Sequence, residues 1–406
     1  MISYEEALRL LLTSATVAPA RMLPLARATG VVTAAAATAR LAVPAFANAA
    51  MDGYALRAAV TRVASPGTPV RLAVTGTIAA GDRPPAAGDL ECVEIFTGAT
   101  VPAGLDAVIP LERVTLLAAG AGVLIPEPVR PGQNIRQAAQ DFVQGQMVVA
   151  AGTRLWPQHL MALAACGVDE VLVVPPPRVA VLITGNELTD RGADLAPGQI
   201  RDANGPYLRA LLPLLGAELT TLTTAPDSAV ALCDRLRELA NGAAVIVTTG
   251  GVSAGRLDLL PAAVRALGGE LCFHKVAIRP GKPILHARLP GGALLFGLPG
   301  NPLAVAVGMR FFVTPALRAL QGLAPEVPEP ARTTEVVRGR GELRFFAKAS
   351  VDLDPSGQRL VRMLPGQESF RIAPLLNANC WAMVPEGESA IPAGSALATL
   401  PLYPGM

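Results

Sequence analysis

The sequence predicts a multidomain α/β protein, with a doubly wound α/β domain near its centre and β-rich regions on either side. From Arg178 onward, apolar strand-like runs alternate with helix-like segments over roughly 150 residues, which is typical of a parallel sheet. Residues 44–140 and 333–406 consist of short strand-like runs broken by Gly and Pro. A chain of 406 residues is long enough for about two to four such domains.

The N-terminal part is expected to start with a helix, because Ser3 and Glu6 form a capping-box pattern ahead of an apolar run. The runs at 70–78 and 121–129 predict strands of the first β-rich region. Residues 153–170 are expected to be helical again.

The central region is expected to place its loops at one edge of a sheet. RVAVLITG, which starts at Arg178, predicts a buried strand, and ELTTLTT and AAVIVTTGG predict two more. Helices are expected over 205–216, 229–240 and 257–267. Since ligands of parallel sheets bind beyond the carboxyl ends of the strands, the turns that follow these strands are the candidate site.

The last third of the chain contains an uncharged stretch and a linker. Residues 292–309 carry no charge, but Pro299, Gly300, Asn301 and Pro302 interrupt them, which favours a buried strand and a core helix over a membrane span. The Pro-rich segment 323–331 predicts a linker, and the alternation beyond it predicts a small β-barrel or sandwich.

The composition argues against several classes of function. The formal net charge is +2, so bulk charge predicts neither nucleic-acid nor membrane-surface binding. The five cysteines are scattered without a CxxC pair and only three histidines are present, so no zinc site is expected. The N-terminal ISYEEALRLLL carries acids where a signal peptide carries positive charge, so we expect a cytoplasmic protein.

One glycine-rich segment, TTGGVSAG, follows the third predicted strand. Gly250 and Gly251 would bring backbone amides close to an anion, and Ser253 would add a hydroxyl. When this segment is taken alone, an ordinary strand-to-helix turn is the favoured interpretation. It does not match the P-loop pattern, which disfavours ordinary nucleotide hydrolysis.

Charged residues flank the glycine-rich segment. Asp202 and Asp258 follow strand ends, where carboxylates could hold Mg²⁺, although a helix cap or a first-turn acid is the alternative for each. Lys275, Arg279 and Lys282 stand around a Pro-Gly turn that would aim them at an anion. A solvated hairpin is the alternative for these cations.

Other segments have less specific chemistry. GLPGNP has no charge, so Pro299 and Gly300 are expected to shape a loop, and Asn301 is expected to cap the following helix. Asp52 lies in a turn sequence in the first β-rich region. Two further segments there contribute polar side chains, and spacing alone does not predict whether they cluster: Thr97, Arg136 and Asp141.

Seven segments occur in the order found in one family: MDGYA, FTGATVP, GQNIR, GQIRDAN, GGVSAG with a following Asp, RPGKP and GLPGNP. On these motifs the chain resembles the molybdopterin molybdenumtransferases, which include the bacterial MoeA proteins and the E domain of gephyrin. The resemblance covers nearly the whole chain, and the joint match is highly specific although a single motif would not be.

The resemblance implies four domains and a homodimer. An elongated helical domain would comprise residues 1–43 and 141–176, with a β-rich domain at 44–140 inserted in it. An α/β domain at 177–322 would bind molybdopterin, and a C-terminal β domain would occupy 332–406. The active site would lie between the α/β domain of one subunit and loops of the other.

The implied reaction takes adenylyl-molybdopterin and molybdate, releases AMP and leaves molybdenum on the dithiolene, with help from Mg²⁺. Asp202 and Asp258 would hold the metal, and Arg279 and Lys282 would hold molybdate. Catalytic roles are implied for Asp52, Asp202, Asp258, Lys275, Arg279 and Lys282. Substrate-binding roles are implied for Thr97, Arg136, Asp141, Glu187, Gly250, Gly251, Ser253, Pro299, Gly300 and Asn301. Arg344 and Ser369 loosely match a further oxyanion-binding pair.

The chain departs from the family pattern at a few positions. Asn186 replaces the usual Asp after the first strand, Ala49 replaces a Ser, and Arg256 and Arg279 replace other residues. Three alternatives stay open: a molybdopterin adenylyltransferase-like step, a molybdopterin-binding scaffold, and a tungsten-handling paralogue. A molybdopterin adenylyltransferase and a molybdoenzyme chaperone are the expected protein partners.

Overall fold

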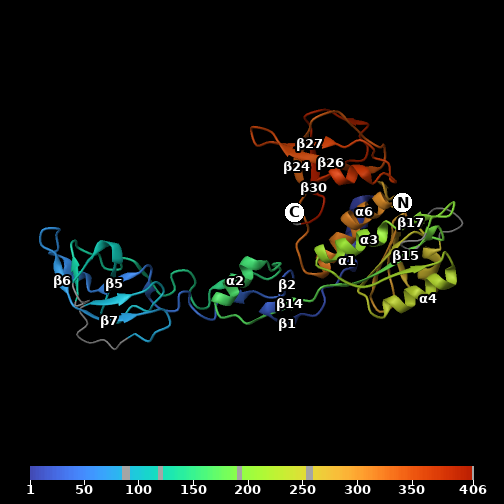
Figure 1. The fold of residues 1–406 in the computed structure, drawn as a ribbon. Helices are drawn as coiled ribbons and strands as arrows, with labels where there is room; N and C mark the ends of the chain where they lie inside the picture. Colours follow the sequence, from blue (N-terminus) through green and yellow to red (C-terminus); the bar gives the residue numbers. More distant parts are fainter. Residues whose placement is uncertain (85–91, 118–121, 190–193, 253–258, 405–406) are drawn as a thin grey trace.

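The computed structural model describes residues 1–84, 92–117, 122–189, 194–252 and 259–404. The molecule is elongated, as Figure 1 shows. The first β-rich region lies at one end, a small group of strands with helix α2 (Pro157–Ala165) lies in the middle, and the α/β and C-terminal β regions lie together at the other end.

The central sheet has six strands in the order β18-β15-β19-β23-β22-β20. Its first four strands, β18 (Glu218–Ala225), β15 (Arg178–Thr184), β19 (Val245–Thr249) and β23 (Leu294–Leu298), are parallel. The last two, β22 (Leu285–Arg288) and β20 (Glu270–His274), run antiparallel to their neighbours. The predicted parallel sheet is therefore confirmed in its core and extended by an antiparallel edge.

Helices cover both faces of this sheet and bury the two sides of its apolar strands. One face packs against α1 (Tyr4–Ser14), α3 (Asn204–Leu214), α6 (Pro302–Gly308) and α7 (Thr314–Leu320). The other packs against α4 (Ala229–Ala240) and α5 (Leu260–Ala266). Such two-sided burial explains why the strands read as continuous apolar runs rather than as alternating ones.

Two helix predictions need correction at their ends. The helix expected from 257 begins at Leu260, because Leu259 is its N-cap residue and Pro261 suits the first turn. The helix expected over 153–170 spans Pro157–Ala165 only, and the chain then enters strand β14 (Glu170–Val174). At the N-terminus the predicted cap is confirmed, since Ser3 Oγ accepts a hydrogen bond from the Glu6 amide at 3.1 Å.

The segment Pro302–Leu320 is a single helical run in which α6 and α7 flank a π-helical turn, Met309–Val313. It is long and apolar enough to cross a membrane by length and composition. Its side chains are nevertheless buried in the protein core, Val305, Phe312 and Leu317 completely. The expected core helix is therefore confirmed.

The middle of the molecule combines segments from both sides of the β-rich insertion. Strands β1 (Arg21–Pro24) and β2 (Val32–Thr33) pair with β14, and α2 packs nearby around Leu155 and Leu163. The connections to the insertion are β3 (Ala37–Thr38) with β13 (Met147–Val149), and β4 (Asn48–Ala49) with β12 (Ile135–Arg136).

The first β-rich region contains two small sheets. One has the order β7-β8-β5-β9, and the other the order β10-β11-β6. Their strands are β5 (Gly53–Leu56), β6 (Val70–Leu72), β7 (Val74–Ile78), β8 (Cys92–Ile95), β9 (Ala107–Pro110), β10 (Thr115–Leu116) and β11 (Val123–Ile125).

The C-terminal region is a closed barrel, which decides between the barrel and the sandwich that the sequence left open. Strand β26 pairs with both β27 and β28, and β24 and β30 complete the ring. The five strands are β24 (Glu329–Thr333), β26 (Arg344–Leu353), β27 (Arg359–Met363), β28 (Cys380–Val384) and β30 (Ala396–Pro401). Strand β21 (Ile278–Arg279) joins β26 in parallel and links the barrel to the α/β region.

A buried histidine makes the stability of this fold dependent on pH. His286 on β22 is fully buried, stacks on Phe296 and donates from Nδ1 to the Leu295 carbonyl at 3.2 Å. Burial lowers its pKa from 6.5 to about 4. Between these values the unfolded chain binds more protons than the folded one, so stability is full above pH 6.5 and falls as the pH drops towards 4.

We expect His286 to cost about 3 kcal/mol of the free energy of unfolding between pH 7 and pH 4. Urea unfolding of the wild type and of His286→Gln across this range checks the prediction. The variant should lose the extra acid dependence, whereas His159→Gln, at a half-buried position, should retain it. Parallel pH profiles for the wild type and His286→Gln would contradict the assignment.

Candidate functional site

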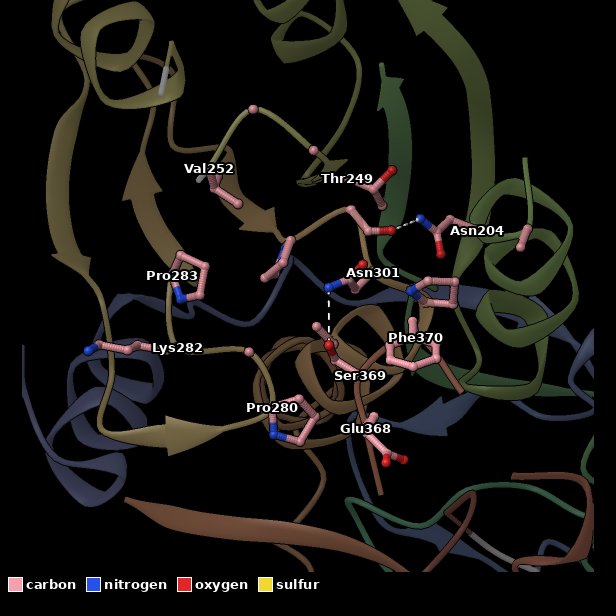
Figure 2. A pocket seen from close by; sticks show the side chains of 18 of the residues that line it. Asn204, Thr249, Val252, Pro280, Lys282, Pro283, Asn301, Glu368, Ser369 and Phe370 are labelled. Atoms are coloured by element: carbon pink, nitrogen blue, oxygen red, sulfur yellow. Dashed lines mark hydrogen bonds between the residues drawn. The ribbon is translucent and has the colours of Figure 1, made fainter. Parts of the chain in front are cut away.

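A cavity of about 770 Å³ lies at the carboxyl ends of β15, β19 and β23. Loops after these three strands line one side, the Pro280-Gly281 turn lines another, and a loop of the barrel lines a third (Figure 2). The predicted site residues that the structure brings together here are Glu187, Asp202, Gly250, Gly251, Arg279, Lys282, Pro299, Gly300 and Asn301.

The turn after β19 requires glycine for a physical reason. Gly250 has a φ of +89°, and a Cβ atom there would lie 2.6 Å from both the carbonyl oxygen and Oγ1 of Thr184. The Gly250 amide itself is used, because it donates to the Leu298 carbonyl at 2.9 Å. The three strand-end loops are thus packed backbone to backbone, which only a residue without a side chain permits.

Asp202 serves a structural role as well as lining the cavity. Its Oδ1 accepts hydrogen bonds from the amides of Asn204 and Gly205, both at 2.9 Å, at the start of α3. The helix-cap alternative is therefore realised. The carboxylate also lines the cavity, and Glu187 adds a second carboxylate to its lining.

Of the three expected cations, two reach the cavity. Arg279 and Lys282 line it on either side of the Pro-Gly turn. Lys275 does not line it: this residue has a positive φ of 72°, and its carbonyl accepts from the Ile2 amide at 3.2 Å. The lining thus holds two of the three cations, although the backbone keeps Lys275 near Lys282, since the Val276 amide donates to the Lys282 carbonyl at 2.9 Å.

Asn301 does not use its side chain as a helix cap, contrary to the prediction. It occupies the N-cap position of α6, but its Nδ2 donates to Ser369 Oγ at 3.1 Å instead (Figure 2). Ser369 is not paired with Arg344, as the resemblance loosely suggests. Arg344 forms ion pairs with Glu5 and Glu386 and lines a separate cavity in the barrel.

Sequence reasoning missed part of the cavity wall. The barrel loop contributes Gln367, Glu368 and Phe370. The first residue of α3, Asn204, also lines the cavity, and its Nδ2 donates to the Gly300 carbonyl at 2.9 Å. PGQESF has the same combination of Pro, Gly and polar side chains as the recognised loops. This pattern is the feature of the sequence from which the barrel loop could have been predicted as part of the site.

The cavity adjoins a second one of about 650 Å³ on the side of β18. The two share Leu188, Arg201 and Asp202, which belong to or follow the short strands β16 (Leu188–Thr189) and β17 (Ile200–Arg201). Asn186, where the family pattern has Asp, lines the second cavity and exchanges hydrogen bonds with Asp227. Together the two cavities offer room for a ligand with two bulky halves.

The remaining predicted residues lie elsewhere. Asp52 Oδ1 accepts from the amide and Oγ1 of Thr97, at 2.7 and 2.8 Å, and these bonds lower the pKa of Asp52. Arg136 donates to the Ala50 carbonyl at 3.4 Å, close to Asp52 in the sequence. We call Asp52, Thr97 and Arg136 the Asp52 cluster. Asp141 lies where the chain leaves the insertion, and its amide donates to the Val43 carbonyl.

The Asp52 cluster and the cavity are far apart in one chain. β5, which directly follows Asp52, lies at the opposite end of the molecule from β15 (Figure 1). Ser253, Arg256 and Asp258 lie outside the described residues. Within the described ranges, no group of three or more His, Cys, Asp or Glu side chains could hold a metal ion.

Three family models match the chain. Residues 2–167 match the MoeA N-terminal region (domain I and II), residues 180–319 match a "probable molybdopterin binding domain", and residues 330–402 match the MoeA C-terminal region (domain IV). These matches together span almost the whole sequence.

Named relatives are similar over nearly their full lengths. The molybdopterin molybdenumtransferase of Synechococcus elongatus is 35% identical over 97% of this chain and 98% of its own. Molybdopterin molybdenumtransferase 2 of Mycobacterium tuberculosis is 34% identical over 92% and 93%. The crystal structure of a molybdopterin biosynthesis MoeA protein from Pyrococcus horikoshii superposes with a TM-score of 0.81 at 29% identity, covering 99% of both chains. The chain therefore belongs to the MoeA family of molybdopterin molybdenumtransferases.

Proposed function

We propose that this enzyme inserts molybdenum into molybdopterin, using adenylyl-molybdopterin and molybdate and releasing AMP. The observation that carries the proposal is the cavity itself, which glycine turns at strand ends line together with Arg279 and Lys282. Such a site suits two anionic substrates. A transferase of the molybdenum cofactor pathway fits both this chemistry and the named relatives.

The chain's residues would act mainly by electrostatics and positioning. Molybdate and the adenylyl pyrophosphate repel each other, and the cations of Arg279 and Lys282 would offset this repulsion. The backbone around Gly250 and Gly251 would hold the pterin phosphate, and Ser253 would add a hydroxyl. The loop Pro299-Gly300-Asn301 would keep the substrate-facing backbone in shape. No protein thiolate or imidazole is needed, because the dithiolene of the substrate takes the metal.

The donor set of the cavity fits Mg²⁺. Asp202 and Glu187 place two carboxylates in its lining, and Mg²⁺ is commonly held by one or two carboxylates plus substrate phosphates. We assign Asp202 and Asp258 as its ligands, with Glu187 nearby. Bound there, Mg²⁺ would neutralise phosphate charge during release of AMP.

We further propose a homodimer with composite active sites. The Asp52 cluster, with Thr97 and Arg136, cannot reach its own cavity across the length of the chain (Figure 1). An antiparallel partner subunit would bring its Asp52 cluster, together with the end of its insertion at Asp141, to this cavity. Lys275, whose neighbour Val276 donates to the Lys282 carbonyl, would act from the same subunit as the cavity. The C₂ symmetry usual for dimers would create two such sites.

The wider setting follows from the substrates. We place the enzyme in the cytoplasm, with a molybdopterin adenylyltransferase supplying its substrate and a molybdoenzyme chaperone receiving its product. Small anionic molecules, rather than nucleic acid or a membrane, are its ligands.

The test is release of AMP from adenylyl-molybdopterin by the purified protein, with and without molybdate and Mg²⁺. We expect AMP release that requires both and that leaves molybdenum on the pterin. Tight pterin binding without AMP release would favour the scaffold, and formation of adenylyl-molybdopterin from ATP would favour the adenylyltransferase. Faster turnover with tungstate would favour the tungsten-handling paralogue.

A further inference from the structure

A loop of the barrel, residues 364–371, forms one wall of the cavity. It connects β27 to the short 3₁₀ helix η6 (Ala373–Asn377) and presents Glu368, Ser369 and Phe370 to the cavity. Loops of this length that lack regular structure usually move. The loop can form a fixed wall of the cavity only if contacts with the rest of the barrel hold it in place.

Two side chains tie this loop to strand β26. Lys348 is fully buried, and its Nζ donates to the carbonyls of Gly366 and Arg371 at 2.7 and 3.0 Å, within the loop and at its end. Gln367 bonds back to the strand, since its Oε1 accepts from the Lys348 amide at 3.0 Å and its Nε2 donates to the Lys348 carbonyl at 2.8 Å. Its Nε2 also donates to the Leu364 carbonyl at 2.7 Å, at the start of the loop. We call these five bonds the Lys348–Gln367 strap.

The bonding of Lys348 is unusual for a buried cation. Its ammonium group donates to two backbone carbonyls of the loop rather than to a carboxylate. Removing an ammonium group from water costs several kcal/mol, which two carbonyl bonds offset only when they stay in place. The ammonium group therefore requires the loop in this conformation.

The loop in turn docks on the strand-end loops of the α/β region. The Ser369 carbonyl accepts from the Leu303 amide at 3.3 Å, and Ser369 Oγ accepts from Asn301 Nδ2 at 3.1 Å (Figure 2). A continuous set of contacts thus runs from Lys348 in the barrel to Asn301 in the cavity lining. Small shifts of the loop would move both Ser369 and Glu368.

We propose that Lys348 and Gln367 are positioning residues that hold loop 364–371 as the barrel-side wall of the active site. Lys348 does not line the cavity, and Gln367, which does, uses both polar atoms of its side chain in the strap. The strap therefore acts through Ser369 and Glu368. The expected change in the KM for molybdate rests on the proposed function. The structural part of the inference, an immobilised loop, stands without it.

Lys348→Met tests the strap with a side chain of similar length that can be buried without a charge. We expect amide hydrogen exchange of residues 364–371 to accelerate about tenfold or more, since about 1.4 kcal/mol of lost loop stabilisation corresponds to a factor of 10. We also expect the KM for molybdate to rise about tenfold while kcat changes less than about twofold, because the wall is displaced rather than the reacting groups removed.

Gln367→Met provides a second variant outside the barrel strands, so that a folding defect of the first does not end the test. Gln367→Met should also accelerate the amide exchange of residues 364–371 and raise the KM for molybdate. Arg362→Met is the matched control, because Arg362 is an exposed cation on the neighbouring strand β27. It should leave loop exchange and both kinetic constants close to the wild type.

Unchanged exchange of residues 364–371 in Lys348→Met and Gln367→Met would overturn the strap. Faster exchange with an unchanged KM for molybdate would overturn its role in the site. Failure of the proposed function has a different signature: the wild type would release no AMP, while the exchange comparison would still decide whether the strap holds the loop.

Discussion

A mixture of Asp52→Ala and Lys282→Ala is expected to recover activity that neither variant has alone. In a mixed dimer, one composite site combines the intact cavity of the first variant with the intact Asp52 cluster of the second. With random pairing, half of the dimers are mixed and half of their sites are intact, so about one quarter of wild-type activity should return. The recovered activity is measured as the rate of AMP release by the co-expressed variants.

The control pairs two variants from the same cluster, Asp52→Ala and Arg136→Ala. Each mixed dimer then has one damaged cluster at every site, so no activity should return. Recovery in this control, or none in the first mixture, would contradict an active site shared between subunits. A shared site also accounts for a structural fact, namely that Asp52 and Thr97 form a well-bonded pair far from their own cavity.

Gly250→Ala is expected to reduce kcat/KM about 100-fold or more. The added Cβ would lie 2.6 Å from Thr184 atoms, so the strand-end loops after β15 and β19 would have to separate. A misplacement of about 1 Å at a reacting centre is enough for a loss of this size. The positive φ adds about 1 kcal/mol of backbone strain. Steady-state kinetics and thermal unfolding of the same preparation check both parts.

Gly291→Ala is the matched control for backbone strain. Gly291 has a φ of +90°, but no atom lies within 4 Å of the position that an added Cβ would take. The residue is in the turn before β23, at the opposite end of that strand from the cavity. The variant should lose about 1 kcal/mol of stability and keep its activity within about twofold. Equal activity losses in the two glycine variants would show that strain, rather than contact with Thr184, is responsible.

Local chemistry makes much of the central fold predictable. Strands β15 and β19 and helix α4 are predicted within a few residues of their observed bounds, because buried parallel strands and amphipathic helices leave strong periodic patterns. The start of α5 is misplaced, since Leu259 and Leu260 read alike in sequence although only one is helical. Cap and turn positions depend on neighbours that periodicity does not reveal.

Some site residues are predictable for the same reason and others are not. Gly250 follows a strand whose end the sequence identifies, so its place at the cavity follows from the rule for parallel sheets. Asn301 has a local explanation as a cap, but its side chain bonds to Ser369, which lies 68 residues further along the chain. No pattern in the sequence encodes that pairing.

The sequence by itself determined the family, the central sheet and the loops at its carboxyl edge, because these depend on short-range patterns and on motifs in a specific order. Only the tertiary structure decided that the C-terminal strands close into a barrel, that Lys282 but not Lys275 lines the cavity, and that buried Lys348 bonds to the loop carrying Ser369. These outcomes depend on contacts between segments far apart in the chain. Burial and hydrogen bonding, which select such contacts, act only once the segments have been brought together.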